Sequence, residues 1–241
     1  MIRLIIFDLD GPILDSLTRS KEGLSEGAKK ISAIRGIKIL PEPEAFTRCW
    51  GYPGLKTASS IFPRLATDEL RIITDCWAKN ELKKKIPLVR GAIKTLEYLK
   101  KRGIFTAILT SRSHNLKFHL ADYPLDNLFE IIQSWQSPEL KPEKIHHNHI
   151  FSSRHKPDPE VLNPILKWAE KQNIEKGEII LIDDTLVGLE TARNGGLNFL
   201  GVCNGPLDSK EKWLKYGNLD AKCVISSIAD LPAWLAEYGG M

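Results

Sequence analysis

The sequence lacks any hydrophobic run long enough to cross a membrane. A membrane-spanning helix needs about 20 consecutive apolar residues, and no stretch of the 241-residue chain approaches that length. The apolar run that ends at Phe7 is too short for a signal peptide, and carboxylates follow it directly. We therefore expect a cytoplasmic protein that has no membrane partner.

Cysteine is scarce, and its spacing gives no sign of a zinc site or a redox motif. The chain has four cysteines, and none of them forms a C-x-x-C pair. Buried free thiols in a reducing compartment fit this pattern better than disulfides do. The four residues are Cys49, Cys76, Cys203 and Cys223.

The sequence also lacks a strong excess of charge of one sign. Its 34 Lys and Arg residues and 30 Asp and Glu residues give a net charge of +4. The densest basic run is only Lys83–Lys85, whereas a nucleic-acid-binding protein more often has a basic stripe interleaved with aromatic residues. We expect no nucleic-acid partner, and the mildly basic balance suits a small anionic substrate.

What is present is an alternation of short apolar runs and helical patterns. Such an alternation predicts an α/β fold, with a Rossmann-like parallel sheet covered by helices on both faces. The predicted strands are 4–7, 104–109, 130–133, 178–182, 199–203 and 223–225. The predicted helices are 91–102, 113–122, 157–172, 185–194 and 228–237.

Residues 16–90 interrupt this alternation. Helical periodicity covers 19–34 and 68–85, a loop-like stretch covers 49–55, and no convincing strand is present. We therefore expect a small all-helical cap domain at 16–90, inserted into a core made of 1–15 and 91–241.

The segment from Ser134 to His155 is polar, and we interpret it as a long irregular loop. Its histidines have a spacing that fits no familiar metal site. A solvated loop or a subunit contact is the better interpretation of these residues, which are His146, His147, His149 and His155.

Acidic residues follow two of the predicted strands. Ligands on parallel sheets bind beyond the carboxyl ends of the strands. Asp8 and Asp10 follow the first strand, two residues apart, so both carboxylates can face one site. Asp183 and Asp184 end a second apolar strand. Two acidic pairs at two strand ends are typical of a magnesium site, although a strand-end turn or a helix N-cap explains each pair taken alone.

Three further polar residues lie at the same predicted edge. Thr110 ends the strand 104–109, and its hydroxyl suits a phosphate oxygen, with Ser111 as a competitor for that role. Lys156 lies between the Thr110 and Asp183 strands and precedes a helix. A lone Lys is normally a solvated surface residue, and only its order in the chain favours a role at the site.

Taken together, these residues resemble the four motifs of the haloacid dehalogenase superfamily. The closest resemblance is to the phosphoglycolate-phosphatase-like branch, which carries a helical cap between its first and second motifs. The matching segments cover nearly the whole chain: Asp8-Leu9-Asp10-Gly11 with Asp15-Ser16, Thr110, Lys156-Pro157-Asp158-Pro159, and Asp183-Asp184 with 192–196.

The resemblance implies a magnesium-dependent phosphatase that acts on a small phosphomonoester. Asp8 resembles the nucleophile that forms an aspartyl-phosphate, and Asp10 resembles the general acid/base. Thr110 would bind the transferring phosphoryl group, and Lys156 would neutralise charge beside it. Asp8, the backbone carbonyl of Asp10, and Asp184 would hold Mg²⁺, with Asp183 as a further candidate ligand.

The chain departs from the family pattern in three places. Pro12 replaces a frequent Thr, which removes one backbone donor. Asp183 stands where many relatives have Gly, and Gly188 stands where they have a second Asp. The pair Lys141-Pro142 competes with Lys156-Pro157 for the third motif, and we prefer Lys156 because a convincing helix follows it.

Leu9, Ser111, Arg48 and Lys56 are the candidate substrate-binding residues. Together with Trp50 and Tyr52, Arg48 and Lys56 surround a Gly/Pro loop of the expected cap and suit recognition of the leaving group, but ordinary cap packing and surface charge explain these four residues equally well. Lys56 also keeps a phosphonate hydrolase open, and a phosphomutase or a non-catalytic regulatory module is a further alternative. A dehalogenase is disfavoured because it usually lacks an acid/base at the position of Asp10. We expect a monomer or a homodimer.

Overall fold

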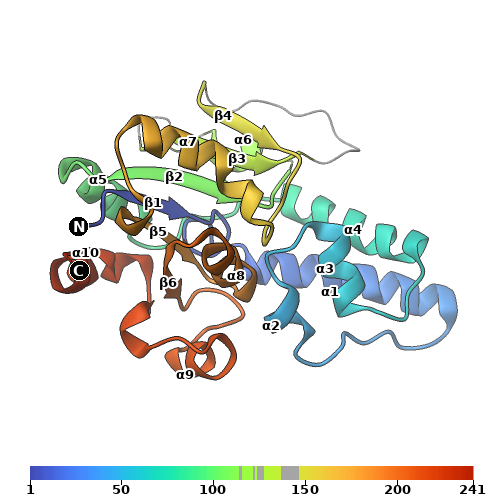
Figure 1. The fold of residues 1–241 in the computed structure, drawn as a ribbon. Coiled ribbons are helices and arrows are strands. Elements are labelled where there is room, and N and C mark those ends of the chain that lie inside the picture. The colour runs from blue at the N-terminus through green and yellow to red at the C-terminus, as the bar shows by residue number, and fades with distance from the viewer. Residues whose placement is uncertain (114–115, 122, 124–127, 137–146, 241) are drawn as a thin grey trace.

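The computed structural model describes residues 1–113, 116–121, 123, 128–136 and 147–240. Its centre is a seven-stranded sheet with the order β4-β3-β2-β1-β5-β6-β7, in which every neighbouring pair is parallel (Figure 1). The strands are β1 (Leu4–Phe7), β2 (Phe105–Thr110), β3 (Ile131–Trp135), β4 (His149–Ser152), β5 (Ile179–Asp183), β6 (Asn198–Val202) and β7 (Val224–Ile225).

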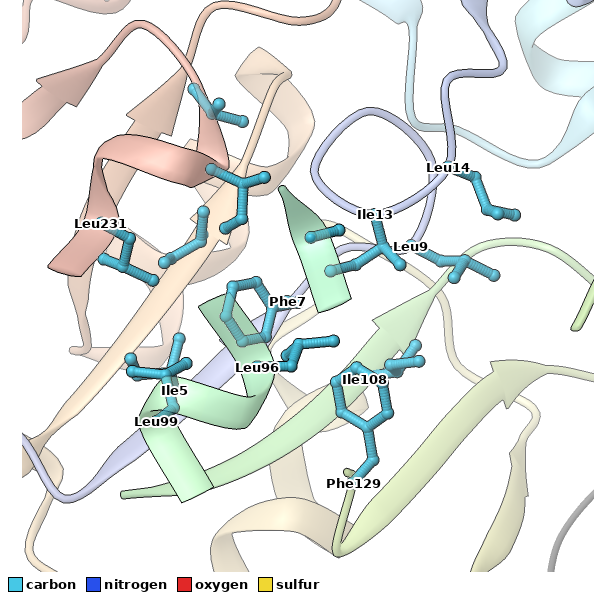
Figure 2. Close-up of a cluster of buried hydrophobic side chains, with 14 of the residues drawn as sticks. Ile5, Phe7, Leu9, Ile13, Leu14, Leu96, Leu99, Ile108, Phe129 and Leu231 are labelled. Carbon is cyan, nitrogen blue, oxygen red and sulfur yellow. The ribbon is translucent and has the colours of Figure 1, made fainter. Parts of the chain in front are cut away.

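The sheet is buried on both faces because side chains alternate along each strand. Ile5 and Phe7 of β1 pack in one hydrophobic cluster, and Leu4 and Ile6 pack in another. Helices α5 (Ala92–Lys101), α6 (Leu116–Leu120) and α10 (Leu231–Tyr238) cover the first face. Helices α7 (Asn163–Lys171) and α8 (Leu186–Gly195) cover the second. Figure 2 shows Ile5 and Phe7 beside α5 in the first cluster.

This architecture confirms the predicted fold class, an α/β core with a parallel sheet between two layers of helices. The other helical elements that follow α5 in the described part of the chain are short. They are α9 (Lys210–Lys212), a π-helical turn at Trp213–Gly217, and 3₁₀ turns at Pro159–Leu162, Lys176–Glu178, Ala221–Cys223 and Ile228–Asp230. None of the helices in the described part of the chain is long and apolar enough to cross a membrane.

Four helices form a separate body beyond the carboxyl ends of the strands (Figure 1). They are α1 (Leu17–Arg35), α2 (Ala45–Cys49), α3 (Gly54–Ile61) and α4 (Thr67–Leu82). Their apolar side chains, such as those of Ile31, Trp50 and Ile73, form a hydrophobic cluster distinct from those of the sheet. We call α1–α4 the helical segment.

Two paired strips of chain connect the helical segment to the sheet. Leu14 and Leu88 form an antiparallel bridge, and Val89 N donates to Ile13 O at 2.8 Å. Ile86 already packs in a cluster of the sheet. We propose that the boundary between core and cap lies at these strips, close to the predicted limits at residues 15 and 91.

Two local interpretations of the sequence are corrected by the structure. The stretch 49–55 is a loop only from 50 to 53, because α2 ends at Cys49 and α3 begins at Gly54. The segment from Ser134 to His155 contains the end of β3 and all of β4, so it is not wholly irregular. Both errors have the same cause, since these elements are too short for their periodicity to be visible.

His149 shows why β4 was missed. The imidazole is buried, and its Nε2 lies 2.8 Å from Ser134 Oγ on the neighbouring strand. A buried polar side chain with a hydrogen-bond partner is stable in a sheet. In the sequence, however, a polar residue at such a position looks like part of a loop. His146 and Lys141 lie outside the described residues.

Candidate active site

Asp8 begins the site, because β1 ends at Phe7 and delivers the next side chain to the edge of the sheet. The carboxylate is buried, with Oδ1 accepting from Leu9 N at 2.8 Å and Oδ2 lying 3.1 Å from Lys156 Nζ. Burial raises the pKa of Asp8 to about 8, and the positive charge of Lys156 offsets only part of this rise. Leu9 itself is fully buried in the core, so only its backbone belongs to the site.

Lys156 is a buried cation and not the surface residue that a lone Lys usually is. Its side chain is 1% exposed, and Nζ lies 2.7 Å from Asp183 Oδ2 and 3.1 Å from Asp8 Oδ2. Burial works to lower the pKa of Lys156, but Asp183 and Asp8 outweigh it and raise the pKa above its ordinary value. The ammonium therefore stays charged between two carboxylates from adjacent strands.

Asp183 has hydrogen-bond partners on both of its oxygens. Oδ2 accepts from Lys156, and Oδ1 accepts from the backbone N of Thr185 at 2.9 Å and from its hydroxyl at 2.7 Å. A Cβ at Gly188 would lie 2.0 Å from Asp183 Cγ. The carboxylate of Asp183 thus fills the space into which a side chain at position 188 would project, which accounts jointly for the two departures from the family pattern.

Asp184 is the opposite case, since both of its buried carboxylate oxygens lack a hydrogen-bond partner. A Cβ at Gly11 would lie 2.2 Å from the Asp184 carboxylate, and a Cβ at Gly205 would lie 1.9 Å from Asp184 Oδ2. The absence of a side chain at these two glycines therefore makes room for the side chain of Asp184. Burial, followed by the charges of Asp183 and Asp8, raises the pKa of Asp184 well above its usual value. An unpaired buried carboxylate is costly unless a cation or a proton neutralises it.

A cation is the natural partner of this cluster. Asp8, Asp183 and Asp184 each offer an oxygen, and these atoms lie within 4.8 Å of one another. They are the one group of His, Cys, Asp and Glu side chains among the described residues whose ligand atoms converge in this way. Carboxylate oxygens are the ligands that Mg²⁺ prefers, so the residues present fit a magnesium ion.

Asp10 lies apart from this cluster and is held by Arg112. Nε of Arg112 donates to Asp10 Oδ2 at 3.0 Å, and Nη2 donates to Oδ1 at 2.6 Å. Burial works to raise the pKa of Asp10, but Arg112 outweighs it, so the pKa lies below its usual value. Nη1 of the same guanidinium donates to Glu81 Oε2 at 2.7 Å.

Arg112 and Glu81 are site residues that sequence reasoning missed. Arg112 follows the predicted pair Thr110 and Ser111, so its place at a strand end was a usable signal. Nothing in the sequence indicates Glu81, because it lies near the end of α4, 31 positions away from its partner. A charged residue on an amphipathic helix normally faces water.

Thr110 and Ser111 end β2 at the same edge of the sheet. Thr110 is buried, and its hydroxyl accepts from Arg112 N at 3.1 Å. Ser111 Oγ donates to Gly51 O at 2.6 Å, which joins the sheet to the loop between α2 and α3. A Cβ at Gly51 would lie 2.9 Å from Thr185 Oγ1, so the loop approaches the sheet closely at this point.

A cavity of about 130 Å³ lies between the sheet and the helical segment. The residues from the sheet are mainly the polar ones described above, whereas the helical segment contributes a stacked pair of indoles, Trp50 and Trp77, whose ring centroids are 5.4 Å apart. The lining includes Asp8, Asp10, Thr110, Ser111, Arg112 and Trp135 on one side, and Trp50, Tyr52, Trp77 and Glu81 on the other.

Two predicted substrate-binding residues are not brought to this cavity. Arg48 is exposed and pairs with Glu44 at 3.3 Å, and Nζ of Lys56 lies 3.8 Å from the centroid of the Tyr52 ring. Neither belongs to the cavity lining. Trp50 and Tyr52, the other two residues that surround the same loop, do line the cavity.

Comparison with known proteins assigns the family. The family model described as haloacid dehalogenase-like hydrolase matches residues 5–202, which include every site residue named above except Gly205. The chain belongs to this family. The expected family membership and the expectation of an enzyme are thereby confirmed.

Individual relatives are distant. A Clostridium perfringens protein with the provisional name pyrophosphatase PpaX is 23% identical over 208 residues, which cover 84% of each chain. A crystal structure of β-phosphoglucomutase from Clostridium difficile has a TM-score of 0.67 at 18% identity and covers 100% of both chains. A structure described as a predicted phosphoglycolate phosphatase from Haemophilus somnus has a TM-score of 0.66 at 18% identity, covering 96% of this chain and 97% of its own. At such identities the structures show a shared fold.

Proposed function

We propose that this chain is a magnesium-dependent phosphatase that hydrolyses a small phosphomonoester through an aspartyl-phosphate on Asp8. One observation carries the proposal: Asp8 meets a buried cation, Lys156, and an unpartnered buried carboxylate, Asp184, at one edge of the sheet. Phosphoryl transfer is mostly positioning and charge neutralisation, and this edge combines a candidate nucleophile with groups suited to both tasks.

In the first step, an oxygen of Asp8 attacks phosphorus and the bond to the leaving oxygen breaks. Asp10, which Arg112 keeps ionised before substrate binds, takes a proton from solvent when the negatively charged phosphate binds beside it, and gives that proton to the leaving oxygen, which departs as an alcohol. In the second step, Asp10 takes a proton from water, and the resulting hydroxide attacks the same phosphorus. The bond between phosphorus and the Asp8 oxygen breaks, which releases inorganic phosphate and restores the Asp8 carboxylate. Covalent catalysis of this kind divides one difficult displacement into two easier ones.

The neighbouring residues supply positioning and charge. Lys156 holds one oxygen of Asp8, and Asp183 holds Lys156 in turn, so the ammonium lies beside the carboxylate that would carry the phosphoryl group. Thr110 is within reach as a hydroxyl donor to a phosphoryl oxygen. Mg²⁺ held by Asp8, Asp184 and the backbone carbonyl of Asp10 would neutralise these carboxylates and the charge of the phosphoryl oxygens.

The leaving group would lie in the cavity against Trp50 and Trp77. Enclosure by the helical segment would exclude water from the reacting atoms, as lids do in many enzymes. The family relatives named above act, by their names, on pyrophosphate, phosphoglycolate or phosphoglucose.

A phosphomutase is the main alternative on the same site, since it would return the phosphoryl group to a sugar in place of water. A phosphonate hydrolase needs a lysine that forms an imine, and the position of Lys56 outside the cavity lining gives it no support. A non-catalytic module would need no nucleophile at Asp8.

The test is a screen of sugar phosphates, phosphoglycolate, nucleotides and pyrophosphate with Mg²⁺, read by release of inorganic phosphate. The proposal predicts release that stops on chelation of Mg²⁺ and in the variant Asp8→Asn. Transfer of the phosphoryl group to a second position of a sugar phosphate, seen by ³¹P NMR without net phosphate release, would replace the phosphatase with a mutase. If no compound of the screen is turned over in the presence of Mg²⁺, both the phosphatase and the phosphomutase are contradicted.

A further inference from the structure

The contact between Arg112 and Glu81 joins the helical segment to Asp10. The guanidinium lies between two carboxylates: it makes two hydrogen bonds to Asp10, at 3.0 and 2.6 Å, and two to Glu81, at 2.7 and 3.4 Å. Both side chains of the Arg112–Glu81 pair are nearly inaccessible, with 7% and 6% exposure. Four of the five N–H groups of an arginine are thus used within the protein.

Glu81 is itself held firmly by the helices. Its Oε1 accepts from Ser20 Oγ of α1 at 3.2 Å and from Trp77 Nε1 of α4 at 2.8 Å. The carboxylate therefore cannot follow Arg112 if the guanidinium moves. Because the arginine fork is planar and rigid, a fixed Glu81 also fixes the plane in which Arg112 meets Asp10.

We propose that Glu81 is a positioning residue for proton transfer: it fixes Arg112, and Arg112 fixes the carboxylate of Asp10 toward the leaving group. This inference rests on the proposed role of Asp10 as general acid/base. Proton transfer requires the acid within hydrogen-bond distance of the leaving oxygen, and displacement of a catalytic group by about 1 Å can cost on the order of 100-fold in rate.

The bidentate contact is compatible with this role. Each carboxylate oxygen has two lone pairs, and Arg112 occupies one on each oxygen of Asp10. Ser16 also donates to Asp10, which leaves one lone pair for a leaving oxygen or a water. Asp10 and Arg112 both line the cavity, as does Glu81, so the oriented carboxylate faces the space assigned to the substrate.

Two aromatic phosphates of similar shape separate positioning from stability. Benzyl phosphate releases an alkoxide that needs a proton, and p-nitrophenyl phosphate releases a phenolate that does not. We expect Glu81→Gln to lower kcat/KM on the order of 10- to 100-fold for benzyl phosphate and about threefold or less for p-nitrophenyl phosphate. The ratio kcat/KM reports the steps up to the aspartyl-phosphate, so the later activation of water does not affect it.

The matched control is Glu26→Gln, which removes an exposed ion pair with Lys83 at 3.0 Å on the same helices. It should change neither value. Arg112→Gln should give the same selective loss for benzyl phosphate, and Glu81→Gln combined with Arg112→Gln should be no worse than Arg112→Gln alone, within about twofold, because Glu81 acts through Arg112. Equal losses on both substrates, or additive losses in the double variant, would overturn the proposal.

Hydrogen exchange at Arg112 Nε, measured by NMR, tests the contact without turnover. We expect protected exchange in the wild type and fast exchange in Glu81→Gln, whereas unchanged exchange in the variant would overturn the positioning role. If the wild type hydrolyses neither these two phosphates nor any compound of the screen above, the proposed function fails, and the exchange result still decides whether Glu81 fixes Arg112.

Discussion

The two buried cations of the site, Lys156 and Arg112, differ in what they connect. Each lies between two carboxylates and is almost inaccessible to water. The partners of Lys156, Asp8 and Asp183, end two adjacent strands, β1 and β5, of the same sheet. The partners of Arg112 belong to different bodies, Asp10 to the sheet and Glu81 to α4 of the helical segment.

This difference teaches where the site is rigid and where it depends on the helical segment. The parallel pairing of β1 with β5 places Asp8 and Asp183 side by side, and the contacts of Lys156 described above involve no residue of α1–α4. The orientation of Asp10 depends on how the helical segment sits over the sheet. On the proposed mechanism, charge neutralisation would therefore depend on residues outside α1–α4, and the alignment of proton transfer would depend on the contact between Arg112 and α4.

Of the two buried cations, Lys156 should have the larger effect on turnover when it is removed. Lys156→Ala removes the positive charge that lies 3.1 Å from Asp8 Oδ2 and leaves Asp8 and Asp183 repelling each other, so on the proposed mechanism we expect turnover to fall on the order of 100-fold or more. The fall should be equal for benzyl and p-nitrophenyl phosphate, because charge neutralisation does not depend on leaving-group protonation. The control Lys141→Ala should do little, and the reverse pattern would show that the other Lys-Pro pair serves the site.

Asp184 is the carboxylate that neither cation contacts, so its variant tests the magnesium assignment. Asp184→Asn should lower activity on the order of 10- to 100-fold, an effect that rising Mg²⁺ partly reverses. Full activity of this variant at low Mg²⁺ would remove Asp184 from the metal site.

The raised pKa of Asp184 also predicts that the stability of the Mg²⁺-free protein depends on pH. Because burial raises the pKa of Asp8 to about 8 from 3.8, and also raises that of Asp184, the folded chain binds more protons than the unfolded chain between these pH values. The free energy of unfolding therefore falls as pH rises through this window. Without Mg²⁺, we expect the Tm of Asp184→Asn to exceed that of the wild type by a margin that grows from pH 5 to pH 8. With Mg²⁺ present, we expect the wild type to have the higher Tm. A margin independent of pH would contradict the assignment.

Arg112→Lys should have a moderate effect that sharpens the comparison. Lysine keeps the positive charge but cannot make the planar bidentate contact. We expect roughly a 10-fold loss of kcat/KM for benzyl phosphate and almost none for p-nitrophenyl phosphate. If Arg112→Lys behaves like the wild type on both, charge and not geometry is what Arg112 supplies.

The exposed cations of the helical segment should matter least. Arg48→Ala and Lys56→Ala change residues outside the cavity lining, so we expect effects on kcat/KM of less than about threefold, within the range of ordinary surface substitutions. A loss above 10-fold in either variant would show that the leaving group extends beyond the indoles of Trp50 and Trp77.

The sheet was predictable from the sequence because its central strands are continuous apolar runs that end at polar residues. β1 and β5 were placed to within one residue, and Asp8, Thr110 and Asp184 follow from the rule that sites lie beyond the carboxyl ends of the strands. β4 was not predictable, since its four residues include the buried polar His149 and Ser152. Its stability comes from pairing with β3, which local sequence does not record.

The site was predictable where chain order carries the signal. Lys156 follows from its place between two strands, although its burial does not. The Arg112–Glu81 contact was not predictable, because it depends on how α4 packs over the sheet, and no local pattern reports the partner of a charged side chain. Nor does the sequence show that both oxygens of Asp183 accept hydrogen bonds, from Lys156 and Thr185, while the carboxylate oxygens of Asp184 have no hydrogen-bond partner.

The most direct test of the account is to find where the phosphoryl group is attached during turnover. The chain is mixed with substrate and Mg²⁺, quenched in acid, digested and analysed by mass spectrometry, with Asp8→Asn as the control. The account predicts a phosphoryl group on Asp8 in the wild type, and neither a phosphoryl group nor turnover in the control. A phosphoryl group on any other residue, or turnover by Asp8→Asn, would contradict it.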